Sequence, residues 1–172
     1  MIAQEDRALA ALRGPYSGSA GHLDAPYWQT PDALVEAMLD LAGVGPGDQL
    51  IDLGCGDGRI VIAAARRGAR ALGIDIDPER VAGAEAAAMA AGVVATARFR
   101  HEDLFATRLE DATVIALYLL PHVNAMLCAR LRGELRPGSR VVGHAFPMRD
   151  WAPTAQERID GRQLYLWLVP ER

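Results

Sequence analysis

The stretch DLGCGDGRI, from Asp52 to Ile60, decides the fold of this chain. A short, mostly apolar segment, 49–51, precedes it, and a helical pattern follows from Ile60 to Arg67. A strand, a glycine-rich loop and a helix in this order are typical of the first βα unit of a nucleotide-binding fold.

The carboxylates around this loop indicate which kind of nucleotide it binds. Asp52 lies just before Gly54, and Asp57 lies between Gly56 and Gly58. Like charges a few Å apart repel by about 1 kcal/mol or more, so this lining disfavours a pyrophosphate. S-adenosylmethionine carries a sulfonium and an ammonium group and no phosphate. The loop therefore predicts S-adenosylmethionine as the cofactor, held by these two acids and three glycines.

A dinucleotide-dependent dehydrogenase is the nearest alternative. Its fingerprint has a third glycine or another small residue at the position that Arg59 occupies here. An acid ahead of the loop also fits a sulfonium cofactor better than a pyrophosphate. The pattern favours the methyl donor.

Two further acids lie where a bound adenosine would need them. Asp75 ends the predicted strand 70–74, 23 residues after Asp52. A carboxylate about 20 residues beyond the loop is placed to accept both ribose hydroxyls. Asp103 follows the predicted strand 96–100 and could accept a hydrogen bond from the adenine amino group, or it could be a turn residue.

Other residues complete the predicted cofactor site. Cys55, Ile76 and Leu104 are expected to offer apolar surface to the adenine ring. Thr30 is also placed among the cofactor-binding residues. With Pro31 it has the pattern of a helix N-cap followed by proline at the first helical position.

Tyr118 closes the apolar run 112–118 and is followed by Leu-Leu-Pro. Ligands of open α/β folds bind at the carboxyl edge of the sheet. We therefore place Tyr118 among the cofactor-binding residues and expect it, with the segment PYWQTP (26–31), to shape a narrow aromatic channel to the methyl group. The scattered histidines are expected to be structural, and His144, at the end of the predicted strand 140–145, is the one expected to face this cleft.

Two acids have a structural interpretation beside the functional one. Asp77 precedes Pro78, a pattern that predicts a helix cap rather than a ligand. Asp57 could cap the helix after the glycine loop and still contact the cofactor, because the two roles are compatible.

The rest of the chain predicts alternating strands and helices and hence an α/β, Rossmann-like parallel sheet with helices on both faces. Asp160-Gly161 is a strong hairpin signal, so the sheet is expected to end in an antiparallel C-terminal hairpin. Residues 1–25 are expected to form an N-terminal arm, and 26–172 a single domain. The expected strands are 49–53, 70–74, 96–100, 112–118, 140–145, 155–159 and 164–169, and the expected helices are 32–42, 58–67, 78–91 and 122–132.

Composition excludes several function classes. The 172 residues carry a net charge of −4 and no lysine, which excludes Schiff-base catalysis and gives no strong nucleic-acid signal. No apolar run reaches the roughly 18 residues of a membrane span. The N-terminus lacks the apolar core of a signal peptide, so a cytoplasmic location is expected. Cys55 and Cys128 lie too far apart in sequence to form a metal-ligand motif, and no metal is predicted.

The chain resembles the class I S-adenosylmethionine-dependent methyltransferases, whose successive cofactor motifs look like DLGCGDGRI, GIDID and EDLF. It is more similar still to the small protein-lysine methyltransferases of the adenine nucleotide translocase and ATP synthase c subunit branch and their bacterial relatives. That likeness covers about residues 26–170 and includes PYWQTP, VIALYLLPHVN, LRPGSRVVGHAFPMRDWAP and LYLWLVP. The resemblance implies in-line methyl transfer to a protein lysine.

Three functions stay open at this stage: a protein-lysine methyltransferase, a methyltransferase of a small molecule or RNA, and an inactive cofactor-binding subunit. Methyltransferases of planar amides and adenine bases carry an Asn/Asp-Pro-Pro-aromatic tetrad where this chain has Tyr118-Leu-Leu-Pro. DNA adenine and glutamine are therefore disfavoured as acceptors. The sequence does not define the acceptor or the oligomeric state.

Overall fold

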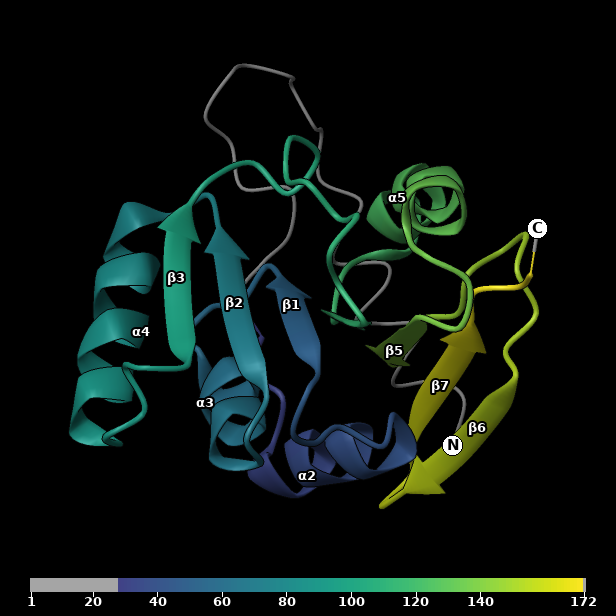
Figure 1. The fold of residues 1–172 in the computed structure, drawn as a ribbon. Helices are drawn as coiled ribbons and strands as arrows, with labels where there is room; N and C mark the ends of the chain where they lie inside the picture. The colour runs from purple at the N-terminus through teal and green to yellow at the C-terminus, as the bar shows by residue number, and fades with distance from the viewer. Residues whose placement is uncertain (1–27, 172) are drawn as a thin grey trace, which may run out of the picture.

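A computed structural model describes residues 28–171 and shows a seven-stranded sheet flanked by helices (Figure 1). The arm expected over 1–25 lies outside the described residues. The strands are β1 (Gln49–Leu53), β2 (Arg70–Asp75), β3 (Ala97–His101), β4 (Val114–Leu117), β5 (Arg140–His144), β6 (Ala155–Ile159) and β7 (Arg162–Leu168). The helices are α2 (Asp32–Leu41), α3 (Arg59–Arg66), α4 (Pro78–Ala90) and α5 (Pro121–Glu134).

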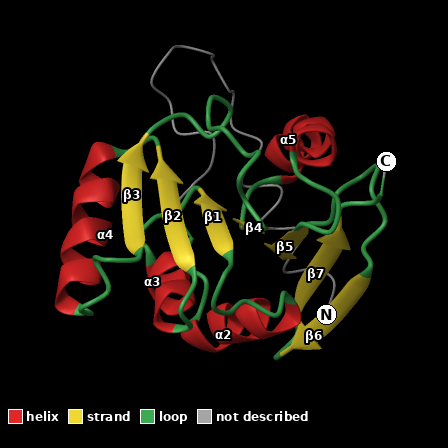
Figure 2. Cartoon of the chain, viewed as in Figure 1, coloured by secondary structure: helices red, strands yellow, loops and turns green. Residues whose placement is uncertain are grey.

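The strands lie in the order β3-β2-β1-β4-β5-β7-β6 (Figure 2). β1 to β5 pair in parallel, whereas β7 pairs antiparallel with both β5 and β6. Asp160 and Gly161 join β6 to β7 with φ values of 49° and 80°, and two consecutive positive φ values are what a tight primed hairpin turn requires. The predicted parallel sheet with a C-terminal hairpin is confirmed.

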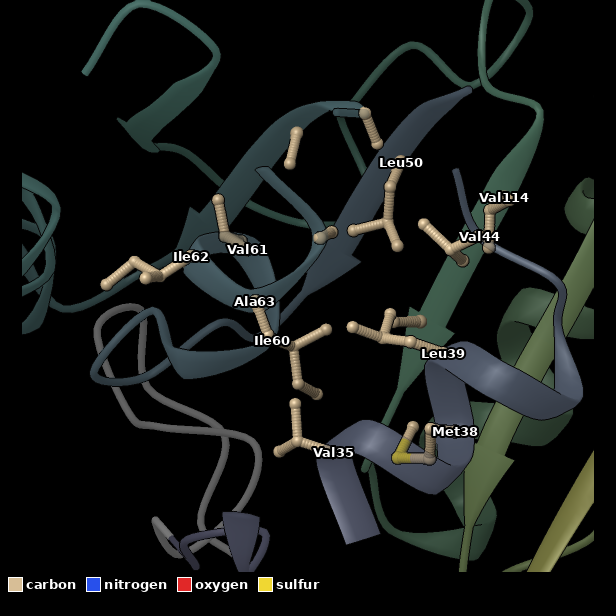
Figure 3. Close-up of a cluster of buried hydrophobic side chains, with 14 of the residues drawn as sticks. Val35, Met38, Leu39, Val44, Leu50, Ile60, Val61, Ile62, Ala63 and Val114 are labelled. Carbon is tan, nitrogen blue, oxygen red and sulfur yellow. The ribbon is translucent and has the colours of Figure 1, made fainter. Parts of the chain in front are cut away.

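Helices cover both faces of this sheet, as predicted. On one face Leu50 and Val114 pack against α2 and α3, in the cluster that Figure 3 shows. On the other face Ile51 and Ile115 belong to a second cluster that contains α5. The alternation along each central strand follows from the period of two in a pleated strand. Because both faces are buried, β1 and β4 read as nearly continuous apolar runs.

The start of α2 differs from the prediction. Thr30 was expected to be the N-cap, but Pro31 occupies that position and the helix begins at Asp32. The reason is that the Pro31 carbonyl accepts the first helical hydrogen bonds, from Leu34 and Val35 (2.9 and 3.0 Å). The cap has no side-chain hydrogen bond, so Thr30 is left to pack as a buried residue.

β1 and β4 are neighbours in the sheet, but the chain continues from β1 into one half of the sheet and from β4 into the other half. The strand order therefore reverses between them. In open α/β sheets such a reversal opens a crevice outside the carboxyl ends of the strands. Here those ends are Leu53 and Leu117. The glycine loop and Tyr118 follow directly, so the fold places them at one crevice.

Candidate active site

The glycine loop after β1 is held to the end of β2 by backbone and side-chain hydrogen bonds. Gly54 and Cys55 N–H groups both donate to the Ile74 carbonyl (2.8 and 2.9 Å). The Gly56 N–H donates to Asp75 Oδ2 (2.9 Å). Gly54 and Gly56 have φ values of 84° and 54°, which glycine adopts without a steric penalty. The loop therefore turns sharply and lies against Asp75.

Asp75 is buried and serves both the loop and the next helix. Its Oδ1 accepts from the Asp77 N–H (3.0 Å) while Oδ2 accepts from Gly56. Asp77 in turn accepts from the Glu79 N–H (2.9 Å) as the N-cap of α4, which confirms its predicted capping role. A carboxylate can accept about four hydrogen bonds, so these two leave capacity on Asp75 for hydroxyl donors.

Asp52 is buried beside the same loop. Burial, with the Asp75 and Asp57 carboxylates nearby, raises the pKa of Asp52 to about 8. A cationic group bound at this position would lower that pKa again, because an opposite charge favours the ionised carboxylate. The buried carboxylate at the end of β1 and its acidic neighbours therefore favour the binding of a cation.

Asp57 connects the loop to the segment before α2. Its carboxylate forms an ion pair with Arg59 (Oδ2 to Nη2, 2.6 Å) and accepts from Gln29 Nε2 (3.3 Å). Arg59 Nη1 also donates to the Thr30 carbonyl (2.9 Å). Gly58 is the N-cap of α3 and makes no side-chain cap bond. As a possible cap of α3, Asp57 accepts only a long hydrogen bond from the Arg59 N–H (3.3 Å). Its ion pair with the Arg59 side chain is therefore stronger than its capping interaction.

A narrow hollow joins these parts at the carboxyl edge of the sheet. It contains six of the residues that the sequence assigns to the cofactor: Thr30, Asp52, Gly54, Cys55, Asp57 and Tyr118. Trp28, Gln29, Arg59 and Ile60 complete its lining. We call it the inner hollow. Residues from three separate parts of the chain therefore converge where the sequence predicts the reactive end of the cofactor.

The remaining predicted residues lie along the edge beyond β2 and β3. Ile76 is exposed, and its carbonyl lies 2.9 Å from His101 Nε2. Asp103 is exposed, and its Oδ1 accepts from the Phe105 N–H (2.8 Å), as expected of a turn residue, while Oδ2 stays available. Leu104 is partly buried and packs on the α5 side of the sheet. The structure does not gather these residues into the inner hollow.

Cys55 belongs more to the core than to a ring-binding surface. A Cβ built on Gly73 would lie 2.7 Å from Cys55 Sγ and 2.6 Å from Phe99 Cδ1. The sulfur therefore packs beneath the middle of β2. Burial raises the pKa of the Cys55 thiol far above its usual value, which makes it an inert, uncharged group.

A second hollow of about 470 Å³ adjoins the first and is lined by Trp28, Gln29, Tyr118 and Arg162. We call it the outer hollow. It shares Trp28, Gln29 and Tyr118 with the inner hollow. The Tyr118 ring is half-buried, and its centroid lies 6.4 Å from that of Trp28. Two aromatic rings therefore stand between the two hollows.

His144 lies behind Tyr118 at the end of β5. The ring centroids are 4.2 Å apart with an interplanar angle of 35°. His144 is 3% exposed, and its Nδ1 has no hydrogen-bond partner among residues 28–171. Burial, assisted by the charge of Arg162, lowers the pKa of His144 to about 4. The imidazole is therefore uncharged at neutral pH.

The chain turns abruptly after His144. Ala145 has φ 68°, and the Phe146 N–H donates back to the His144 carbonyl (2.9 Å), which makes a strained three-residue γ-turn. Asn124 Nδ2, in the first turn of α5, donates to the Phe146 carbonyl (3.2 Å). Such strain is retained where the surroundings hold it, often beside functional sites.

Sequence reasoning missed Arg162 and did not single out Gln29. Gln29 lies within the quoted PYWQTP segment. Arg162 has a weaker signal: it follows the Asp160-Gly161 turn, and an antiparallel return strand brings its start to the carboxyl end of β5, as the pairing of His144 with Leu164 shows. Within the described residues, no group of His, Cys, Asp and Glu could hold a metal ion. No helix in that part of the chain is long and apolar enough to cross a membrane.

Comparison with known proteins gives a consistent picture. The model of the family described as the ANTKMT methyltransferase domain matches residues 52–155. The chain is 40% identical over 152 residues to a protein-lysine N-methyltransferase of Saccharolobus islandicus, covering 85% of this chain and 94% of that protein. It is 38% identical to the mouse adenine nucleotide translocase lysine N-methyltransferase, covering 77% of this chain but only 58% of the mouse protein.

A solved structure is also similar over most of the chain. The crystal structure of an RNA methyltransferase from Salinibacter ruber, in complex with S-adenosyl-L-homocysteine, superposes with a TM-score of 0.83 at 48% identity. The match covers 84% of this chain and 95% of that one.

Proposed function

We propose, on the premise that this chain belongs to the ANTKMT methyltransferase domain family, that it methylates the lysine side chains of a protein. The chain is an S-adenosylmethionine-dependent methyltransferase. One observation supports the choice of acceptor: an inner hollow with an acidic lining and an open outer hollow share the aromatic side chains of Trp28 and Tyr118. A long, slender side chain with a terminal amine fits such an arrangement.

The residues present fit the cofactor. We assign the cationic methionine end to Asp52 and Asp57, whose crowding a cation would relieve. Asp75 has free lone pairs for the ribose hydroxyls. We assign the adenine amino group to Asp103 Oδ2 and the ring surface to Ile76 and Leu104. The loop glycines let the backbone approach the ligand closely.

When bound, the cofactor would supply a methyl group on a positively charged sulfur, which is a good leaving group for in-line transfer to the acceptor nitrogen. The protein's task is to bring that nitrogen to about 3–3.5 Å from the reacting carbon, in line with the leaving group. No covalent intermediate on the protein is required.

Tyr118 and Trp28 are placed to guide the acceptor. The four-carbon stem of lysine packs well between aromatic rings, and its ammonium is attracted to their faces. The nitrogen must lose its proton before it can react, since a free lysine has a pKa of about 10.4. Burial within the hollow lowers that pKa because it disfavours the charged form.

RNA is the second candidate acceptor, favoured by the name of the Salinibacter ruber relative. The net charge of −4 argues against it, because RNA-binding domains usually present a basic face. A small-molecule acceptor and a role as an inactive cofactor-binding subunit are weaker alternatives. We also propose a single domain over 26–172 and a cytoplasmic location, which the free thiols of Cys55 and Cys128 support.

One labelling experiment separates these acceptors. The protein is incubated with methyl-labelled S-adenosylmethionine and extract from cells that lack its gene. Label in protein that yields methyl-lysine on hydrolysis supports the proposal. Label that ribonuclease releases identifies RNA instead, and label only in small metabolites contradicts both. Asp52→Ala serves as the inactive control and should show no transfer.

A further inference from the structure

Arg162 brings a positive charge to the rim of the outer hollow. It is the first residue of β7, directly after the turn at Asp160-Gly161, and it is exposed. The other three lining residues, Trp28, Gln29 and Tyr118, are uncharged. An acceptor amine that enters through the outer hollow passes close to this arginine.

The field of Arg162 reaches the wall of the hollow. Its charge lowers the pKa of His144, in addition to the larger effect of burial. The same charge opposes the rise in the pKa of Tyr118 that burial causes. Both effects have the sign of a nearby cation. Tyr118 lines both hollows, and His144 lies against its ring.

We infer that Arg162 favours the uncharged, nucleophilic form of an amine that enters the outer hollow. The inference rests on the proposed lysine acceptor. The step is a simple proton loss: the ammonium gives its proton to water at the open mouth, and the nitrogen keeps the electron pair that later attacks the methyl carbon. Arg162 contacts neither reacting atom. It acts on the acceptor amine only through its charge.

Asp52 lines the inner hollow, and its pKa of about 8 leaves it mostly uncharged at neutral pH. Its titration is common to the wild type and the Arg162 variants, so the difference between their pH profiles reports Arg162. Asp57 is paired with Arg59 on the inner side. On the hairpin, Asp160 occupies the turn, and Glu157 and Arg158 lie on β6 with opposite charges. The direct partner of Arg162 in the ladder is the neutral Ile159.

His144, behind Tyr118, is uncharged at neutral pH. Of the described residues that line the outer hollow, Arg162 is therefore the one that carries a charge at neutral pH.

A pH profile tests the inference. At saturating S-adenosylmethionine, kcat is measured from pH 6.5 to 10 with the probe acetyl-Gly-Gly-Lys-Gly-Gly-amide. Because the profile of kcat reports ionisations in the bound complex, Arg162→Gln should move its acidic limb up by about half to one pH unit. Turnover then falls roughly 3- to 10-fold at neutral pH and recovers at pH 10.

Two variants make the result specific. Arg162→Lys keeps the charge and should retain the wild-type midpoint. Arg158→Gln removes an exposed charge from the neighbouring strand and should leave the profile unchanged. An unmoved midpoint in Arg162→Gln, or an equal loss at every pH, overturns the inference and assigns Arg162 a merely structural or binding role.

A second measurement needs no acceptor. The NMR titration of His144, assigned with His144→Phe, should move to higher pH in Arg162→Gln and stay in place in Arg162→Lys. An unmoved titration shows that the charge does not reach the hollow and overturns the inference. If the wild-type protein does not methylate the peptide or any protein, the lysine acceptor fails, and this titration still decides the reach of Arg162.

Discussion

The ring of Tyr118, at the end of β4, lies 4.2 Å from the ring of the buried His144, at the end of β5. The contact joins adjacent strands at the switch point of the sheet and supports Tyr118 from behind. The ring centroid of Trp28 lies 6.4 Å from that of Tyr118. Tyr118 therefore lies near two other rings at the junction of the two hollows.

Tyr118→Ala should reduce turnover far more than cofactor affinity. The substitution removes the wall that guides the acceptor, and misplacement of a reactant by about 1 Å can cost roughly 100-fold in rate. Tyr118→Phe keeps the ring and should retain most of the activity. Calorimetry with S-adenosylhomocysteine and a methyl-transfer assay measure the two effects separately. An equal loss of binding and turnover in Tyr118→Ala would contradict the channel role.

His144 makes stability depend on pH in a defined window. Its folded pKa of about 4 lies below the unfolded value of about 6.5, so the unfolded chain binds more protons between these limits. Stability is therefore complete above pH 6.5 and declines as the pH falls towards 4. His144→Phe keeps a ring against Tyr118 and removes the titration. It should gain about 3 kcal/mol of stability on the wild type at pH 4 relative to pH 7, measured by urea denaturation at both pH values. An equal dependence of stability on pH in the two proteins would contradict the assignment.

The three acids proposed to bind the cofactor could be placed close together from sequence because they belong to one local unit. Asp52, Asp57 and Asp75 lie on a strand, the loop after it and the next strand in parallel register. The βα unit has few alternative geometries, so spacing alone places these residues together.

Contacts that depend on distant pairing were not predictable in this way. Arg162 reaches the outer hollow because β7 inserts between β5 and β6, and no local pattern fixes that insertion. The apolar run 112–118 was expected to be one strand, but β4 begins at Val114. Thr113 instead donates its hydroxyl to Asp48 Oδ1 (2.7 Å), which also pairs with Arg140. A polar side chain whose partner lies 65 positions away gives no periodic signal.

Asp52→Asn should stabilise the protein without its cofactor and weaken cofactor binding. The folded pKa of Asp52, about 8, lies above its unfolded value of about 3.9. The folded chain therefore binds more protons, and stability falls as the pH rises from about 4 to 8. Asparagine does not titrate and so removes this loss. The melting temperature of the variant should be several degrees above that of the wild type at pH 8 and equal to it at pH 4.

The same variant should lose the increase in melting temperature that S-adenosylmethionine gives to the wild type, because a neutral amide attracts the cation less. Thermal unfolding at both pH values, with and without the cofactor, checks both halves. A variant that is stabilised at pH 8 and still binds with unchanged affinity would remove Asp52 from the site.

Gly58, where the loop enters α3, should be intolerant of even one added methyl group. Its φ is 80°, and a Cβ there would lie 2.7 Å from Phe99 Cε1 and 2.9 Å from Ala84 Cβ. Gly58→Ala therefore combines a left-handed backbone with a steric clash and should cost about 3 kcal/mol. Gly92 has a similar φ of 70° and open space around it, so Gly92→Ala should cost only about 1 kcal/mol. Urea denaturation compares the two variants. Equal losses would show that only the left-handed backbone matters and that the Phe99 side chain moves aside without cost. A larger loss at Gly58 would show that Phe99 and Ala84 cannot make room for the added methyl group.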